Sequence, residues 1–580
     1  MLARGNGENA VKTLRNSLIA LLVLAVIVYR AHRWLIARVL RLTPPKYRVA
    51  VEHGLRIPMR DGLTLAADHY APKAAGQFPT ILIRSPYGRN ARAGSFGLLL
   101  GFFGHRFAER GYHVLIQDTR GRFDSQGVFN PYFNESDDGH ATLEWLCSQP
   151  WSNGVIGLWG GSYLGIVQWV IAADSPAVKA IMPAITSTQL QKIVYPDGAL
   201  DLGLALRWMT IFNRLDQART NPLKSLLLLW DVEKTIQPAL LHLPMVEADT
   251  IALGSKVDFF HDWIQHSDMS DDLWRENVEK IKLKQVTQPT YLMSGWYDFF
   301  LRGTLDDYAT LRDLGRRPYL TIGPWHHFGA ITSMADLREG LVWFDAHLYD
   351  DRSRLREKPV RIFVMGANEW RDMDSFPPPS TETRYYLQAA SMLATEPAHA
   401  LAEPTHYTYD PSDPTPAVGG AIFSILGGRR DNRALEARSD VRTYTTSPLR
   451  EAVEIIGRVR LELYAQSSLE YTDFFGRLCD VHPDERSFNI CEGLFRVEPG
   501  KVAKQPDGSM CVEIDMWATA HRFQPGHSIR LQVSSGAHPH WSRNLGTGEY
   551  FGTCTTCKVA EQTIYHDRLH PSALVLPVIK

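Results

Sequence analysis

The chain has 580 residues, 44% of them hydrophobic, with 62 basic and 63 acidic side chains. This length predicts two or three domains with large cores, and the near-zero net charge without a basic–aromatic run argues against a nucleic-acid partner. The six cysteines are too few for a disulfide framework. Cys554 and Cys557 form a lone C-x-x-C motif without a second ligand pair, so we expect free or paired loop cysteines, no metal and no cofactor.

The N-terminus carries an apolar run at residues 17–29, followed by a basic amphipathic stretch at residues 30–41. The run suits the core of a signal peptide and is short for a full membrane span of about 20 residues. With arginines reaching to the lipid surface, residues 17–41 can form one tilted, uncleaved helix. We therefore expect residues 1–43 to be an N-terminal membrane anchor of open orientation; the alternative is an amphipathic helix of a cytoplasmic enzyme.

The next segment alternates between predicted strands and predicted helices, which favours a parallel sheet with crossover helices. The strands are expected at residues 80–84, 113–117, 155–159 and 178–185, the helices at 140–148 and 163–173, and further strands at 290–293 and 319–322. Residues 44–186 and 285–383 are therefore predicted to form one α/β domain.

Two other textures complete the chain. Residues 187–284 lack β alternation and predict a helical cap inserted into the α/β domain, with helices at 200–207, 223–230, 257–264 and 274–282. From residue 384 to residue 580, short alternating runs separated by turn clusters predict an all-β sandwich. Its expected strands include residues 384–387, 457–465, 494–497, 511–516 and 528–534.

Ser162 follows an apolar strand and the glycine pair Gly160-Gly161, and it precedes an apolar helix. This is the setting of a nucleophile elbow, a tight strand-to-helix turn that projects the serine hydroxyl at the strand's carboxyl end. The strict G-x-S-x-G pattern is not met, because Leu164 stands in the second glycine's place and Gly165 comes one residue late. The alternative is an ordinary strand–helix turn.

Two later strands end in the partners that a serine nucleophile needs. One ends at Asp298 and the other at His326-His327, so the chain order is Ser, Asp, His, as in α/β-hydrolases. An imidazole can take the serine proton at neutral pH, and a carboxylate fixes its tautomer. Taken singly, Asp298 suits a loop cap and His327 a surface position; three strand ends in this order predict a Ser162–His327–Asp298 triad.

The residues resemble those of the CocE/NonD hydrolases, cocaine esterase-type members of the Xaa-Pro dipeptidyl-peptidase (S15-like) superfamily, from about residue 48 to the C-terminus. The likeness rests on Arg84-Ser85-Pro86-Tyr87, Gln117-Asp118-Thr119-Arg120-Gly121-Arg122, Pro150-Trp151-Ser152-Asn153-Gly154, Gly160-Gly161-Ser162-Tyr163-Leu164-Gly165, Gly295-Trp296-Tyr297-Asp298 and Gly323-Pro324-Trp325-His326-His327. The resemblance implies an α/β-hydrolase fold with a helical cap and a C-terminal jelly roll.

The resemblance also assigns roles. The family's elbow has the same late glycine, and its Gly-Pro-Trp-x-His motif gives the base role to His327 rather than His326. Its oxyanion hole implies the Tyr87 hydroxyl and the backbone N–H of Tyr163. Independently, Tyr87 lies in the loop after the strand at 80–84, where an α/β-hydrolase takes its second oxyanion donor; the alternative is a tyrosine that only packs on the loop.

The leading hypothesis is a serine hydrolase that cleaves small esters or amides through a covalent acyl-enzyme, without a cofactor. Phe299 and Phe300 follow Asp298 where the amino-ester hydrolases carry acids, which predicts an apolar or aromatic substrate pocket. An Xaa-Pro dipeptidyl-peptidase acting on short peptides is the alternative, and a non-catalytic binding protein on the hydrolase fold is a further one. The natural substrate and the oligomeric state stay open.

Overall fold

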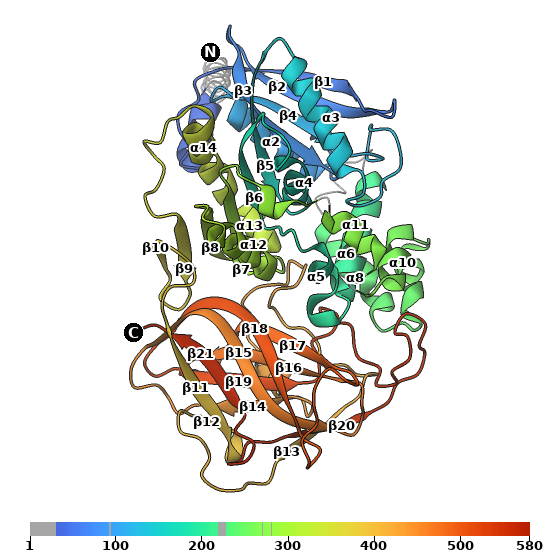
Figure 1. Cartoon of the computed structure of the whole chain (residues 1–580), viewed down its shortest axis with the longest axis vertical. Coiled ribbons are helices and arrows are strands. Elements are labelled where there is room, and N and C mark those ends of the chain that lie inside the picture. The colour runs from blue at the N-terminus through green and yellow to red at the C-terminus, as the bar shows by residue number, and fades with distance from the viewer. Residues whose placement is uncertain (1–30, 92–93, 218–227, 269–270, 280) are drawn as a thin grey trace, which may run out of the picture.

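The computed structural model describes residues 31–580, apart from 92–93, 218–227, 269–270 and 280. Figure 1 shows an α/β layer at the top, a group of cap helices beside it, and an all-β body below both. This arrangement confirms the predicted fold class, an α/β-hydrolase domain with a helical cap followed by an all-β domain.

The α/β domain is built on a sheet with the strand order β1-β2-β4-β3-β5-β6-β7-β8-β9-β10. Its middle, from β4 and β3 through β9, is parallel, whereas β1, β2 and β10 are joined antiparallel at the two edges. The strands are β1 (Val49–Pro58), β2 (Thr64–Pro72), β3 (Phe78–Ser85), β4 (His113–Asp118), β5 (Ser152–Gly161), β6 (Val178–Ala184), β7 (Tyr291–Tyr297), β8 (Tyr319–His326), β9 (Val360–Val364) and β10 (Glu369–Met373). All six strands predicted for this domain are present.

Helices cover both faces of this sheet, so its central strands are apolar on both sides. In β3, Ile81 and Ile83 pack into the cluster that contains Phe103 and Phe344, whereas Leu82 packs into the cluster on the opposite face. The helices are α2 (Ser95–Ala108), α3 (Glu135–Ser148), α4 (Tyr163–Ala172), α12 (Leu301–Asp313), α13 (His327–Thr332) and α14 (Ala335–Leu348).

The cap lies between β6 and β7 in the chain. It comprises α5 (Leu190–Val194), η2 (Pro196–Gly198), α6 (Leu202–Gln217), α8 (Leu228–Leu240), η4 (Met245–Glu247), α9 (Ala248–Leu253), α10 (Asp258–Gln265), α11 (Asp272–Glu279) and η5 (Leu283–Gln285). The helices predicted at 257–264 and 274–282 correspond to α10 and α11, and that at 200–207 is the start of α6. Most of the helix predicted at 223–230 lies outside the described residues.

The C-terminal body is all β apart from the single-turn α15 (Arg433–Glu436) and η6 (Ala389–Ser391) among its described elements. Its strands are β11 (Thr381–Gln388), β12 (Met392–Ala394), β13 (Thr405–Tyr409), β14 (Arg442–Thr445), β15 (Val453–Ser467), β16 (Thr472–Val481), β17 (Ser487–Val497), β18 (Met510–Phe523), β19 (Ser528–Ser534), β20 (Ala560–Ile564) and β21 (Ala573–Val578). The five strands predicted here are all present. The Met365 N–H donates to Ala520 O at 2.9 Å, which joins the end of β9 to β18 across the two bodies.

The end of the predicted N-terminal segment packs against the α/β domain. Residues 31–39 are helical, Ala37 is buried, and Arg33 Nε lies 2.7 Å from the buried carboxylate of Glu109. The apolar run at 17–29 lies outside the described residues. Among the helices that the structure does describe, none combines the length and the apolar character needed to cross a membrane.

Candidate active site

Ser162 occupies a strained turn between β5 and α4, with φ 60° and ψ −128°. A non-glycine residue with positive φ is uncommon, and such strain clusters at functional sites. Small neighbours make the turn possible: Gly160 has φ +142°, and a Cβ there would lie 2.5 Å from the Leu164 Cβ. A Cβ on Gly165 would lie 2.5 Å from the Thr186 methyl group. The late glycine thus lets α4 pack closely against the chain that leaves β6.

Three predicted residues meet at the carboxyl edge of the sheet. His327 Nε2 lies 3.2 Å from Ser162 Oγ, and His327 Nδ1 lies 2.9 Å from Asp298 Oδ2. The second Asp298 oxygen accepts the Phe300 N–H at 2.8 Å, which fixes the carboxylate. Asp298 and His327 are fully buried. This arrangement lets the imidazole take the serine proton while the carboxylate holds the proton on Nδ1.

Tyr87 lies in the loop after β3, and its hydroxyl oxygen accepts the indole N–H of Trp208 at 3.1 Å. Because an indole can only donate, the phenol proton of Tyr87 is left for another acceptor. Burial raises the pKa of Tyr87 to about 12, against the opposing effect of hydrogen bonds with Trp208 and Ser162. Tyr87 is therefore a neutral donor at physiological pH, next to the serine oxygen.

Tyr163 opens α4 directly after Ser162. Gly165 and Ile166 donate their N–H groups to Ser162 O, so the N–H of Tyr163 is one of the groups that a helix N-terminus leaves without an intrahelical acceptor. The Tyr163 hydroxyl donates to Glu135 at 2.7 Å, and Glu135 is paired with Arg84 at 2.9 Å. This buried chain of contacts holds the residue that follows the serine.

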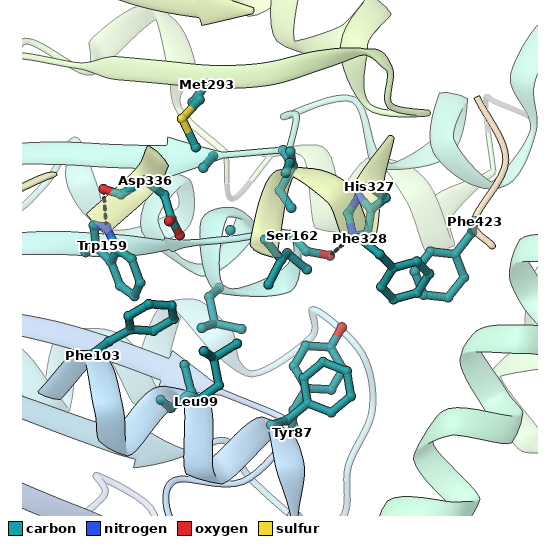
Figure 2. A pocket seen from close by; sticks show the side chains of 18 of the residues that line it. Tyr87, Leu99, Phe103, Trp159, Ser162, Met293, His327, Phe328, Asp336 and Phe423 are labelled. Atoms are coloured by element: carbon teal, nitrogen blue, oxygen red, sulfur yellow. Dashed lines mark hydrogen bonds between the residues drawn. The ribbon is translucent and has the colours of Figure 1, made fainter. Parts of the chain in front are cut away.

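An apolar pocket opens on one side of Ser162. It has a volume of about 70 Å³ and is walled by α2, β5, α6, α13 and the start of α14. Figure 2 shows Leu99 and Phe103 rising from α2, with Tyr87 and Phe423 nearer the Ser162–His327 pair. The pocket can hold the hydrocarbon part of a small substrate beside the serine.

A second, smaller pocket of about 30 Å³ shares Ser162 with the first. The predicted pocket residues Phe299 and Phe300 line this one, and the Phe299 ring also packs, tilted, against the His327 ring at 4.7 Å between centroids. Trp208, Trp263 and Phe423 complete its aromatic wall. Ser162 therefore borders two apolar spaces.

His326, the other histidine of the pair, does not join the hydrogen-bonded group. It ends β8, directly before α13, and burial lowers its pKa. Its ring lies near Gly428, at 3.5 Å from the position that a Cβ there would take.

One cluster among the described residues, Asp480, His482 and His527, brings together atoms that could ligate a metal. Arg429 Nη2 already donates to His482 Nε2 at 3.0 Å, and Asp480 is engaged by His527 at 2.8 Å and His521 at 3.1 Å. A guanidinium on the lone pair that a metal would need makes these residues a poor fit to an ion.

The cysteines are all free, including Cys554 and Cys557.

Comparisons with known proteins agree with this architecture. The X-Pro dipeptidyl-peptidase (S15 family) model matches residues 61–329, and the model of the X-Pro dipeptidyl-peptidase C-terminal non-catalytic domain matches residues 354–575. The chain is similar to cocaine esterase from Rhodococcus sp. (strain MB1 Bresler), with 32% identity over 577 residues that cover 92% of this chain and 99% of that protein.

Two solved structures share the fold. An aminopeptidase from the marine sediment archaeon Thaumarchaeota archaeon aligns with a TM-score of 0.77 and 22% identity, over 92% of this chain and 97% of that one. An α-amino acid ester hydrolase aligns with a TM-score of 0.76 and 23% identity, with the same coverage of both chains. From the cocaine esterase likeness and the family matches, the chain belongs to the CocE/NonD hydrolase family of the X-Pro dipeptidyl-peptidase (S15) superfamily and is a serine hydrolase.

Proposed function

We propose that the protein is a carboxylesterase in which Ser162 is the nucleophile, His327 the general base and acid, and Asp298 the residue that orients His327. Ser162 Oγ attacks the ester carbonyl while His327 Nε2 takes its proton. The bond to the alkoxide then breaks, His327 gives the proton to the alkoxide, which leaves as an alcohol, and the acyl group stays on Ser162 Oγ. Water repeats the sequence and releases the acid.

The Tyr87 hydroxyl and the Tyr163 N–H are proposed as the donors to the oxyanion of the tetrahedral intermediate. The support for Tyr87 is its occupied acceptor side: the Trp208 N–H fills it, so the phenol donates outward. The support for Tyr163 is its place as the first residue of α4. Each such donor contributes about 3 kcal/mol to transition-state stabilisation.

The observation that carries the ester assignment is the pair of apolar pockets that Ser162 borders. Cleavage of an Xaa-Pro dipeptide would need a group that binds the free amino terminus close to the serine. Among its described lining residues, the smaller pocket of Phe299 and Phe300 next to Ser162 includes no carboxylate, and the larger pocket includes one, Asp336, beside Trp159. In the smaller pocket, an apolar acyl or alcohol group therefore fits better than an ammonium ion, whose burial without a partner is costly.

The test combines labelling with a substrate panel. A fluorophosphonate probe should label wild-type protein and not Ser162→Ala, and Ser162→Ala should retain less than about a thousandth of the activity. Wild-type protein should hydrolyse p-nitrophenyl esters of short fatty acids and leave an Xaa-Pro p-nitroanilide nearly untouched. Faster cleavage of the anilide than of the esters would favour the dipeptidyl-peptidase alternative. Labelling of the Ser162→Ala variant would refute the assignment of Ser162 as the nucleophile.

A further inference from the structure

Asp336 is the one acidic residue among the described residues that line the larger pocket. The lining around it is hydrocarbon and aromatic, from Leu99, Phe103 and Trp159 among others. Figure 2 shows the Asp336 carboxyl group directed into this space, beside Trp159 and on the other side of Ser162 from Phe423. Only 8% of the residue is exposed. A buried carboxyl group in such surroundings requires an explanation, because burying a polar group without a partner is costly.

The contacts of Asp336 leave one of its two oxygens available. Oδ1 accepts the Leu337 N–H at 2.8 Å, within the first turn of α14. Within the part of the chain that the structure describes, no hydrogen bond to Oδ2 is formed. The backbone is held separately, since the Trp159 indole N–H donates to Asp336 O at 3.4 Å. The side chain is thus anchored at one oxygen, and the other faces the pocket.

A structural role at the helix N-terminus does not account for this position. An acid in the first turn of a helix interacts favourably with the helix dipole, and a surface acid does so without being desolvated. Burial raises the pKa of Asp336 to about 7, against the smaller effects of the Leu337 N–H and of Arg338. The carboxyl group is therefore kept at a desolvation cost that a hydrogen-bond donor from a bound molecule would offset.

We propose that Asp336 is a specificity-determining residue, which selects esters whose apolar part ends in a hydrogen-bond donor, a hydroxyl or ammonium group, where the wall of the larger pocket carries Asp336 beside Trp159. The chain of such a substrate lies along Leu99 and Phe103, its carbonyl lies at Ser162, and its terminal donor reaches Asp336 Oδ2. This inference rests on the proposed esterase function and names the substrate class of that site.

The test uses two matched series of esters of graded length. One series varies the acyl chain of p-nitrophenyl esters and the other varies the alcohol of acetate esters, each with a terminal methyl, hydroxyl or ammonium group. At the best length, wild-type kcat/KM should favour a donor-ended chain over the methyl-ended chain by about tenfold to hundredfold, the effect of one buried hydrogen bond. Asp336→Leu should reverse this preference by raising kcat/KM for methyl-ended esters.

Two further variants sharpen the result. Asp336→Asn keeps the shape and an acceptor oxygen, so it should retain the preference for hydroxyl-ended over methyl-ended esters. Because it lacks the negative charge, its kcat/KM ratio of ammonium-ended to methyl-ended esters should be about tenfold lower than in wild type. Asp350→Asn, an exposed acid just beyond α14, should leave every ratio as in wild type. Fluorophosphonate labelling of Ser162 checks that each variant is folded.

The outcomes separate this inference from the function on which it rests. If wild-type protein hydrolyses both series with the same terminal-group ratios as Asp336→Leu and Asp336→Asn, the role of Asp336 is refuted and the esterase stands. If wild-type protein is neither labelled at Ser162 nor active on any ester, both proposals fall together.

Discussion

Replacing Tyr87 by phenylalanine removes one oxygen atom from the proposed oxyanion hole and leaves the ring in place. Loss of one such donor costs about 2.7–4 kcal/mol of transition-state stabilisation, so kcat should fall about a hundredfold to a thousandfold. In the wild-type protein the Trp208 N–H donates to the Tyr87 hydroxyl oxygen at 3.1 Å, and the substitution leaves this N–H without that partner. An unpaired buried donor costs about 1–3 kcal/mol, so the melting temperature should also fall by a few degrees.

Trp208→Phe is the matched control, because it deletes the same hydrogen bond from the other side and keeps the Tyr87 hydroxyl. It should lower the melting temperature to a similar extent and raise KM, since Trp208 lines both pockets, while kcat changes less than about tenfold. The assay is kcat with p-nitrophenyl acetate, normalised to active sites counted by fluorophosphonate titration. A Tyr87→Phe variant with kcat within about threefold of wild type, or a Trp208→Phe variant with the larger loss of kcat, would refute the assignment.

The central part of the fold could be predicted because continuous apolar strands of a parallel sheet are visible in the sequence. Each of the three triad candidates follows such a strand, and parallel strands place their carboxyl ends at one edge. Strand β2, which lies between the edge strand β1 and β4, was not predicted. It carries the fully buried Asp68, which is paired with Arg89 at 2.8 Å and with the Asn90 amide at 2.7 Å. These tertiary hydrogen bonds allow a charged residue in a buried strand, and the sequence of that strand therefore resembles a polar loop.

Helix α2 was missed for a related reason. Its sequence contains Gly97, Gly101 and Gly104, which lower helix propensity. A Cβ on Gly104 would lie 2.9 Å from the Tyr70 ring. The glycine therefore serves the close approach of α2 to β2, a contact between segments that the sequence gives no means of pairing.

Several residues that line the two pockets come from segments far from Ser162 in the chain. Phe299 and Phe300 could be proposed because they follow Asp298 directly. Trp208 arrives from the cap and Phe423 from a loop of the all-β body, and no spacing in the chain connects them with Ser162. The cap and this loop are joined through Ser424 Oγ, which donates to Glu233 at 2.5 Å. Asp336 likewise has no local signal, since an acid in the first turn of a helix is common at surfaces.

His327→Ala should abolish turnover and His326→Ala should reduce it less than about tenfold, measured as kcat with p-nitrophenyl acetate; the reverse order would move the base by one residue. Because the folded-state pKa of Asp336 is raised to about 7, the native state holds a proton there that the unfolded state releases between about pH 4 and pH 7. Wild-type stability should therefore fall relative to Asp336→Asn as pH rises through this window, by a few kcal/mol at most, and a melting-temperature difference that is flat with pH would contradict the raised pKa. Deletion of residues 1–30 removes the apolar run of the predicted anchor, so it should leave the melting temperature and kcat unchanged and shift the protein from the membrane to the supernatant fraction. Full-length protein that already fractionates with the supernatant would refute the anchor. Deletion of residues 1–43 also removes Arg33, whose guanidinium pairs with buried Glu109 at 2.7 Å, and the packing of Ala37 against the body. This longer deletion should destabilise the fold by about 1–3 kcal/mol, and equal melting temperatures for the two truncations would show that residues 31–43 do not stabilise the hydrolase domain.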